Sequence, residues 1–330
     1  MAKKTKQKKV PLKKESKTVS KKIVLLGGTG FVGRNVADVL NENKVPFVIA
    51  SRRTGVDLRD PFSCEQFLKK EMPDIVINCA AHVGSLNYVT EQASTVIVDN
   101  TRMILSMYEA IQKVCPKALV INPIANCAYP ANADIYSEDH FWDGPMHHSV
   151  MSFGETRRFL LSVGKSFEMQ YGIKSIYLLV PNMYGPYEST DPNKAHALNA
   201  LVSKFVKAQK EKSDVEIWGT GVAIREWLYA KDFGRIVFQI IQNPTMYSLS
   251  DPTNIAQNHG LSVKELVTII HGNFNNFKGE VKWNTAMPDG ASKKVMDDKR
   301  FRKIFPDFKF SDFKEGIKNT IKYYNSVYPY

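Results

Sequence analysis

Short apolar runs alternate with amphipathic stretches along the first 180 residues of this 330-residue chain. The apolar runs are rich in Val, Ile and Leu, which is typical of buried strands in a parallel sheet. Strands are expected at 22–26, 45–50, 73–81, 117–122 and 175–180, and helices at 35–40, 65–70, 95–114 and 149–171. This alternation predicts an α/β fold in which a doubly wound parallel sheet binds ligands at the carboxyl ends of its strands.

The strict alternation ends near residue 187. The later part of the chain carries a helical pattern at 197–211, a strand pattern at 215–218, the run 224–229, and two more helical patterns at 262–271 and 313–327. We therefore expect residues 22–186 to form the sheet domain. Residues 187–330 are expected to form mainly a smaller C-terminal cap that closes over the substrate, with some later segments returning to the sheet.

The first strand runs directly into a glycine turn, and a helical pattern follows at once. Gly27 suits a tight turn with positive φ, Gly30 allows close approach of a pyrophosphate, and Gly33 allows the helix to pack on the strand. The start of the helix offers free N–H groups and a partial positive charge to phosphates. The order of elements predicts a Rossmann-type dinucleotide site, although glycine turns also end ordinary strands. Its expected residues are Gly27, Thr29, Gly30, Phe31, Val32 and Gly33.

Two arginines follow the second strand, where a dinucleotide fold often carries an acidic residue for the ribose 2′-hydroxyl. Arg52 and Arg53 suit a 2′-phosphate instead, which favours NADP(H) as the cofactor; a solvated basic turn is the alternative. Asp57 is expected beside the adenine. The third strand ends in small residues, and Ala80 and Ala81 leave room for the cofactor.

The net charge of +12 adds little to this picture, because it is concentrated at the start of the chain. Residues 1–22 hold ten Lys and one Glu, which leaves +3 for the other 308 residues. Residues 1–21 are expected to be a disordered tail, either a solvated extension or a contact for an anionic partner. No apolar run approaches the roughly 20 residues of a membrane span. Four scattered cysteines argue against a zinc site or a disulfide framework, so we expect a soluble, cytoplasmic protein without a metal.

Five segments, in this order, resemble the extended short-chain dehydrogenase/reductases that act on nucleotide sugars, and among them the GDP-L-fucose synthase subfamily. They are the turn at 27–33, the segments 78–84, 126–130 and 181–186, and Trp218-Gly219-Thr220-Gly221 leading to Arg225-Glu226-Trp227. The resemblance covers about residues 22–235. It implies an enzyme that takes GDP-4-keto-6-deoxymannose, inverts C3 and C5, and reduces the C4 ketone with NADPH.

Inversion next to a ketone needs a base on one face of the carbon and an acid on the other. The resemblance implies that Cys127 and His196 take these roles, although a small buried thiol and a structural histidine are the ordinary alternatives. It also implies that Arg157 and Pro181 lie at the cofactor, and that Asn182, Lys204, Trp218 and Arg225 bind the GDP-sugar. A homodimer through the helices at 95–114 and 149–171 is common in the superfamily and is expected here.

The residues for hydride transfer depart from the family pattern. Its Tyr-x-x-x-Lys pair falls on Phe153 and Arg157, and its Ser falls on Ala125. Phe153 has no proton to give and Ala125 no hydroxyl. The sequence therefore predicts that C4 reduction is lost or weakened while proton exchange at C3 and C5 persists. Two alternatives stay open: a full epimerase-reductase that uses a substituted acid such as His147 or His148, and a catalytically silent relative that only binds nucleotide sugars.

Overall fold

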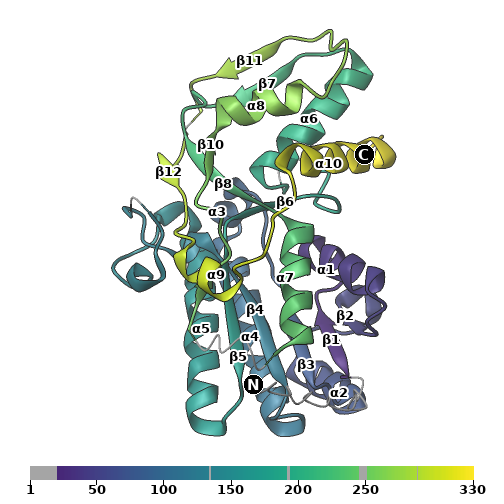
Figure 1. The fold of residues 1–330 in the computed structure, drawn as a ribbon, viewed down its shortest axis with the longest axis vertical. Helices are drawn as coiled ribbons and strands as arrows, with labels where there is room; N and C mark the ends of the chain where they lie inside the picture. Colours follow the sequence, from purple (N-terminus) through teal and green to yellow (C-terminus); the bar gives the residue numbers. More distant parts are fainter. Residues whose placement is uncertain (1–20, 134, 192–193, 245–250, 288) are drawn as a thin grey trace, which may run out of the picture.

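The computed structural model describes residues 21–330 except 134, 192–193, 245–250 and 288. The Lys-rich tail predicted at 1–21 therefore lies outside the described residues, apart from Lys21. Two layers of helices enclose a sheet in the lower half of the molecule, and a smaller unit of helices and short strands lies above it (Figure 1).

The central sheet has six strands, and every neighbouring pair is parallel. In spatial order they are β2 (Val48–Ala50), β1 (Ile23–Leu26), β3 (Ile75–Asn78), β4 (Leu119–Ala125), β5 (Ser175–Val180) and β9 (Thr253–Asn254). From β1 the chain moves outward to β2 and then crosses back to β3 on the other side. The strand order reverses between β1 and β3, which is where such sheets bind ligands at their carboxyl ends.

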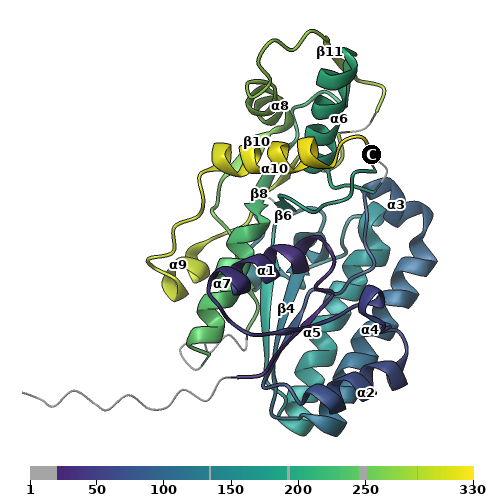
Figure 2. The ribbon, with the colours of Figure 1, turned by 90° about the vertical axis from the view of Figure 1, so that its right-hand side faces the viewer.

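Successive side chains of each strand enter different cores, as the strand period of two requires. Val24 and Leu26 of β1 belong to the core under one set of helices, and Ile23 and Leu25 belong to the other. Helices α2 (Pro61–Glu71), α4 (Ala93–Val114) and α5 (Met151–Tyr171) cover the first face; α1 (Phe31–Glu42), α7 (Ala230–Gln242) and α9 (Lys299–Ile304) cover the second (Figure 2).

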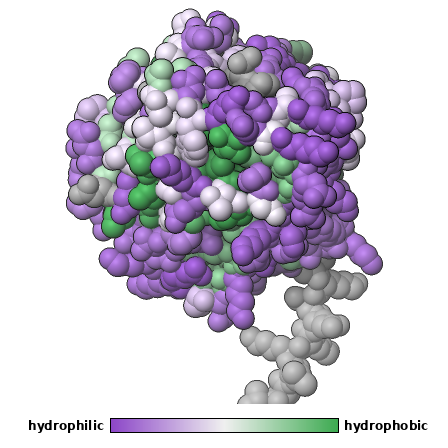
Figure 3. All heavy atoms as spheres, turned by 90° about the horizontal axis from the view of Figure 1, so that it is seen from above, coloured by the Kyte–Doolittle hydropathy of each residue, from purple (hydrophilic) through white to green (hydrophobic). Residues whose placement is uncertain are grey.

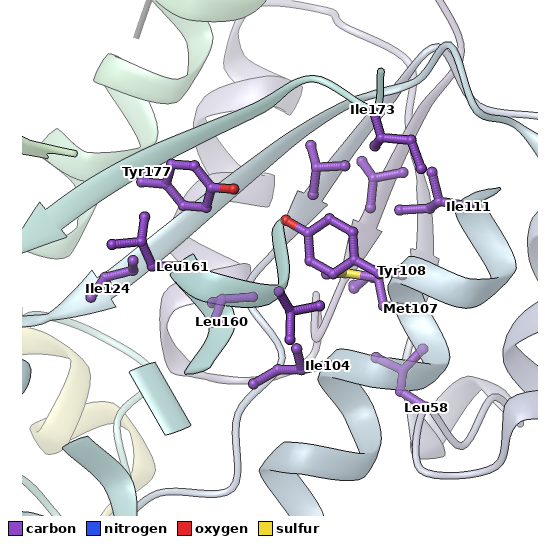
Figure 4. Close-up of a cluster of buried hydrophobic side chains, with 14 of the residues drawn as sticks. Leu58, Ile104, Met107, Tyr108, Ile111, Ile124, Leu160, Leu161, Ile173 and Tyr177 are labelled. Atoms are coloured by element: carbon purple, nitrogen blue, oxygen red, sulfur yellow. The ribbon is translucent and has the colours of Figure 1, made fainter. Parts of the chain in front are cut away.

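The first core contains polar atoms as well as aliphatic side chains. The phenol oxygens of Tyr108 on α4 and Tyr177 on β5 point toward each other (Figure 4). The Tyr108 hydroxyl lies 2.9 Å from Ser175 Oγ and accepts a bond from Asn122 Nδ2 at 3.0 Å. Because a buried polar group is costly unless it is bonded, this network favours one packing of α4 against the sheet.

The upper unit is the cap. Its β8 (Ile224–Tyr229) pairs with β6 (Asn182–Tyr184), β10 (Gly260–Ser262) and β12 (Lys293–Lys294), while β7 (Val215–Trp218) pairs with β11 (Val281–Asn284). Helices α6 (Ala197–Glu211), α8 (Val263–His271) and α10 (Phe313–Val327) share a separate core with these strands. The cap stands over the carboxyl ends of the sheet strands (Figures 1 and 2).

The parallel Rossmann-type fold predicted from the sequence is confirmed, with differences in detail. The expected helix at 65–70 is longer and begins at Pro61, because the Asp60 side chain accepts bonds from the N–H groups of Phe62 and Ser63. Helix α3 (Leu86–Glu91) and strand β6 were not expected. Later segments were expected to return to the sheet, and α7 and β9 are the ones that do so, through contacts with α1 and β5.

Candidate functional site

The glycine turn after β1 is packed against backbone on two sides. Gly27 has φ +72°, and a Cβ there would lie 2.6 Å from the Ala80 nitrogen. A Cβ on Gly33 would collide with the Gly27 carbonyl oxygen. Only glycine allows the turn, the end of β3 and the first turn of α1 to approach this closely. The sequence prediction for these two residues thus agrees with the backbone geometry.

Helix α1 begins directly after this turn without a side-chain cap. Gly30 is the N-cap residue and is exposed, and the first turn of α1 contains no acidic side chain. The N–H groups at the start of the helix are left for a ligand, and the partial positive charge there attracts phosphate. Phe31 and Val32 form the first turn of the helix, and Thr29 precedes its cap. The site therefore fits the pyrophosphate of a dinucleotide.

Arg52 and Arg53 follow β2 in a single 3-10 turn, and both side chains are exposed. The turn is fixed by Ser51 and Thr54, since the Ser51 N–H donates to Thr54 Oγ1 at 2.9 Å. The two guanidinium groups are thus free to meet a ribose 2′-phosphate. Asp57, by contrast, accepts hydrogen bonds from Nε and Nη2 of Arg59. These bonds lower the pKa of Asp57 to about 2.

Cys127 lies in a 3-10 turn directly after β4, as expected of a residue at a strand end. It packs with Ala125 against a small apolar cluster that contains Phe153. Burial raises the pKa of the Cys127 thiol, and the positive charges of Lys294 and Arg157 partly offset this effect. The structure thus brings Cys127 together with Ala125 and Phe153, the two positions where the resemblance implies hydroxyl groups.

Arg157 is buried in α5 and engaged with protein groups. Its Nη2 donates to Asn100 Oδ1 at 3.0 Å, and its guanidinium carbon lies 4.8 Å from the centre of the Phe153 ring. Burial lowers the pKa of Arg157 to about 10. Arg157 as a whole residue is only 4% exposed, and its bond to Asn100 gives it a packing role within the protein.

Lys294 approaches Cys127 from the far end of the chain. It lies on β12, in register with Arg225 of β8. Burial lowers the pKa of Lys294, the Cys127 thiolate raises it, and the Arg225 charge lowers it further. The Arg225 charge lowers the pKa of Tyr136, and the charge of an ionised Cys127 raises it. The Lys294 charge therefore acts on the Cys127 thiol, and Arg225 lies next to Lys294 on the neighbouring strand.

His196 is the N-cap residue of α6, and its Nδ1 lies 2.5 Å from Glu188 Oε2. The surrounding protein disfavours the charged imidazole, but the charge and hydrogen bond of Glu188 outweigh this, so the pKa of His196 is raised. The same contact lowers the pKa of Glu188 against the opposing effect of its burial. The His196 side chain is still 34% exposed, so a proton on it can reach a ligand.

The four residues expected to bind the substrate are Lys204, Trp218, Arg225 and Asn182. Lys204 on α6 lies 5.2 Å from the centre of the Trp218 ring, and its Nζ donates to the Glu216 carbonyl at 3.0 Å. Arg225 donates to the Asp289 carbonyl at 3.2 Å. Asn182 follows Pro181 at the end of β5 and reaches the Glu226 carbonyl at 3.4 Å. All four substrate candidates belong to elements of the cap.

Cys127 and His196 follow neighbouring strands of the sheet. Ala125 at the end of β4 pairs with Val180 at the end of β5, and the chain continues from there to Glu188 and His196. Within the described residues, no hydrogen bond joins Cys127 to His196. Glu188 and Lys294 were not found from the sequence. Glu188 precedes the start of α6 and lies outside any helix or strand, so no periodic pattern links it to His196, and Lys294 is 167 positions from Cys127.

His147, considered from the sequence as a substitute acid, stands at the start of α5. Its Nδ1 lies 2.7 Å from Ser149 Oγ, and its ring is 4.4 Å from that of His148. Burial lowers the pKa of His147, and the charges of His148 and Lys294 add to that shift. At a given pH, less of the His147 ring therefore carries a proton than in an exposed histidine.

The surface over the cap end is mixed in character. Figure 3 shows a group of hydrophobic residues there within a rim of hydrophilic ones, an arrangement typical of ligand-binding surfaces. Among the described residues, none of the helices combines the length and the apolar character that a membrane crossing requires.

The model of the NAD dependent epimerase/dehydratase family matches residues 23–256. The chain belongs to this family. The match confirms the resemblance seen in the motifs and the expectation of an enzyme that works with a nicotinamide dinucleotide. The epimerase/dehydratase match also spans the glycine turn, Cys127, His196 and the return of the chain to the sheet through β9.

Individual relatives in this family share most of their length with the chain. A GDP-L-fucose synthase from Azorhizobium caulinodans is 27% identical over 315 residues, which cover 93% of this chain and 98% of the relative. The solved structure of a GDP-L-fucose synthetase from Naegleria fowleri bound to NADP has a TM-score of 0.83 at 23% identity and covers 94% of this chain and 96% of its own. A GDP-mannoheptose C4 reductase from Campylobacter jejuni, solved with NADP bound, has a TM-score of 0.80 at 23% identity, with 94% and 99% covered.

Proposed function

We propose that this protein binds NADP(H) and a GDP-linked 4-keto-6-deoxy sugar and inverts C3 and C5 of the sugar, while C4 reduction is lost or severely weakened. The observation that carries the proposal is the cluster around Phe153. It keeps the Cys127 thiol but presents Phe153 and Ala125 where the resemblance implies a tyrosine and a serine. The proton-moving part of the site is retained, and the part that completes hydride transfer is absent.

Cys127 and His196 have complementary proton chemistry. The raised pKa of Cys127 keeps the thiol protonated more often than an exposed cysteine, so it can return a proton to carbon. The raised pKa of His196 makes its neutral imidazole a better proton acceptor, and Glu188 stabilises the imidazolium that forms when the ring accepts a proton from carbon. In this proposal the two groups act on opposite faces of each carbon that is inverted.

NADP(H) is placed by the sheet domain. The turn of Gly27 to Gly33 and the start of α1 hold the pyrophosphate, and Arg52 and Arg53 hold the 2′-phosphate. Ala80 and Ala81 follow β3 and Pro181 follows β5, at the carboxyl edge of the sheet, where they would border the space for the nicotinamide half. When bound, the cofactor supplies a hydride donor or acceptor.

The GDP-sugar is assigned to the cap. Lys204 and Arg225 meet the diphosphate, Trp218 offers an exposed ring, and Asn182 bonds the sugar or diphosphate. A second copy of the chain is assigned to α4 and α5, where Val98, Leu105 and Met169 are exposed. Burying such side chains against the same surface of a partner would form a symmetric dimer.

Solvent-proton exchange tests the function. The protein is incubated in heavy water with GDP-4-keto-6-deoxymannose and NADPH, and deuterium in the sugar is followed by mass spectrometry while NADPH is followed by absorbance. Deuterium at C3 and C5 without NADPH oxidation supports the proposal. The Cys127→Ala variant is expected to abolish exchange, whereas Cys115→Ala, which removes a buried thiol elsewhere, retains it. Absence of exchange in the unmodified protein, or brisk NADPH oxidation, contradicts the proposal.

A further inference from the structure

Glu188, the partner of His196, lies in the segment that connects β6 to α6. It is only 8% exposed, and its two carboxylate oxygens have separate partners. Oε2 lies 2.5 Å from His196 Nδ1, and Oε1 accepts a bond from the Ser189 N–H at 2.9 Å. Because a buried carboxylate is costly unless it is bonded, the backbone around Glu188 has to hold it accurately in this place.

Tyr187, the residue before Glu188, has a backbone conformation that side chains disfavour. Its φ is +74°, in the left-handed region, where the Cβ of an ordinary residue crowds the carbonyl oxygen. Such a conformation persists only when the surrounding structure holds it. On one side, Tyr323 of α10 meets the Tyr187 ring edge-on, with the ring centres 5.3 Å apart. The rest of the support comes from the sheet domain.

Helix α1 contacts both residues that precede Glu188. The guanidinium carbon of Arg34 lies 3.9 Å from the centre of the Tyr187 ring, which is a close cation–π contact. Burial raises the pKa of Tyr187, and a hydrogen bond to Asp38 of the same helix raises it further. Asn35 Nδ2 donates to the Pro186 carbonyl at 3.0 Å. The helix thus fixes the ring of Tyr187 and the backbone just before it.

The cap holds the two ends of the same segment. The Gly185 N–H donates to Asn199 Oδ1 at 3.3 Å, and Asn199 Nδ2 donates to the Gly185 carbonyl at 2.6 Å. At the other end, the Tyr324 hydroxyl donates to the Ser189 carbonyl at 2.9 Å. Residues 185–189 are therefore held by the cap at their ends and by α1 in the middle, where Glu188 follows directly.

We propose that Arg34 is a positioning residue for proton exchange: by stacking on Tyr187 it holds Glu188 against His196. This inference rests on the proposed function, in which His196 accepts a proton from carbon. Arg34 directly follows Gly33, in the first turn of the helix whose start is assigned to the cofactor pyrophosphate. One helix therefore serves the cofactor with its N–H groups and His196 with a side chain.

The test measures the pKa of His196 by NMR titration of histidine-labelled protein, with the signal assigned from a His196→Gln variant. Glu188 is the charge that raises this pKa. Arg34 is exposed, so Arg34→Met removes the cation and leaves the fold intact. The pKa of His196 is expected to fall by about one pH unit as Glu188 moves away, and the acidic limb of the exchange pH profile moves down with it. Arg302→Met is the matched control, because it removes a guanidinium that lies 5.3 Å from the Phe310 ring, and it leaves both measurements unchanged.

Two changes at Tyr187 separate the ring from the backbone. Glycine adopts positive φ freely, so Tyr187→Gly removes the ring without adding strain and should lower the pKa of His196 as Arg34→Met does. Tyr187→Phe keeps the ring over Arg34 and should leave this pKa close to that of the unmodified protein. In a Glu188→Gln background, Arg34→Met should change the pKa of His196 no further, because the two residues act through one contact.

The inference is wrong if His196 titrates in Arg34→Met and Tyr187→Gly as it does in the unmodified protein. It is also wrong if Tyr187→Phe lowers the pKa as much as Tyr187→Gly, or if Arg34→Met still lowers it in the Glu188→Gln background. The titration needs no substrate, so it decides the placement of Glu188 by itself. Absence of exchange in the unmodified protein contradicts the proposed function instead.

Discussion

The absent hydroxyl groups can be put back. The triple variant Ala125→Ser, Phe153→Tyr and Arg157→Lys restores the residues that the resemblance implies for hydride transfer. All three positions lie close together, because Ala125 and Phe153 share a cluster and the Arg157 guanidinium stacks on the Phe153 ring. We expect the variant to gain C4 reduction without losing solvent-proton exchange.

The expected gain in NADPH oxidation follows from the side chains that are substituted. A positioned general acid is worth about 10²–10⁴-fold in rate, so NADPH oxidation should rise by at least about 10²-fold. Arg157→Lys gives up the 3.0 Å bond to Asn100, and a bond to a charged group is worth about 1.5–3 kcal/mol. Asn100 Oδ1 keeps the His82 N–H at 3.1 Å, so it is not left unsatisfied. The melting temperature should fall by only a few degrees, at about 2 °C per kcal/mol.

The assay follows NADPH absorbance with GDP-4-keto-6-deoxymannose as the substrate and identifies the product sugar by chromatography. The single variant Arg157→Lys is the control, because it changes the same packing without supplying an acid. The reasoning is refuted if the unmodified protein already oxidises NADPH at the rate of the triple variant. It is also refuted if the folded triple variant binds both ligands and still does not reduce.

Three further outcomes follow from the site. Gly33→Ala should prevent NADPH from raising the melting temperature, because the added Cβ meets the Gly27 oxygen; Gly144→Ala, whose Cβ meets only Pro130 at 3.9 Å, should not. Glu188→Gln removes the charge that raises the pKa of His196, so the acidic limb of the exchange pH profile, where the accepting imidazole becomes protonated, should move to lower pH. An unmoved limb would show that His196 does not titrate in the reaction. The double variant Arg52→Ala, Arg53→Ala should weaken NADPH binding in calorimetry by about tenfold, or ~1.4 kcal/mol, and leave NADH binding unchanged. An equal loss of affinity for NADPH and NADH would show that this turn does not bind the 2′-phosphate.

The elements that the sequence located well are those with a complete pattern of their own. The strand at 175–180 and the helices at 197–211 and 313–327 have the expected bounds, because an unbroken apolar run or a full amphipathic stripe specifies each. Helix α7 carries the same kind of stripe, with Phe233, Ile236, Val237 and Ile240 buried against α1, so the signal for it was present in the sequence. Helix α3 has only six residues and one buried side chain, which is too little for a periodicity.

The residues of the candidate site also differ in how well the sequence could predict them. Positions that follow a strand, such as Gly27 and Cys127, could be predicted, because a parallel sheet gathers the ends of its strands at one edge. Lys294 could not, since its place depends on the pairing of a two-residue strand with β8.

The pairing of β12 with β8 has a consequence for biosynthesis. Every strand of the parallel sheet and the thiol of Cys127 precede residue 255, whereas Lys294 joins the cleft only after about nine-tenths of the chain has left the ribosome. A nascent chain can therefore assemble its nucleotide half while the cysteine still lacks its cationic neighbour. The electrostatic environment of the Cys127 thiol is therefore completed late, when β12 pairs with β8.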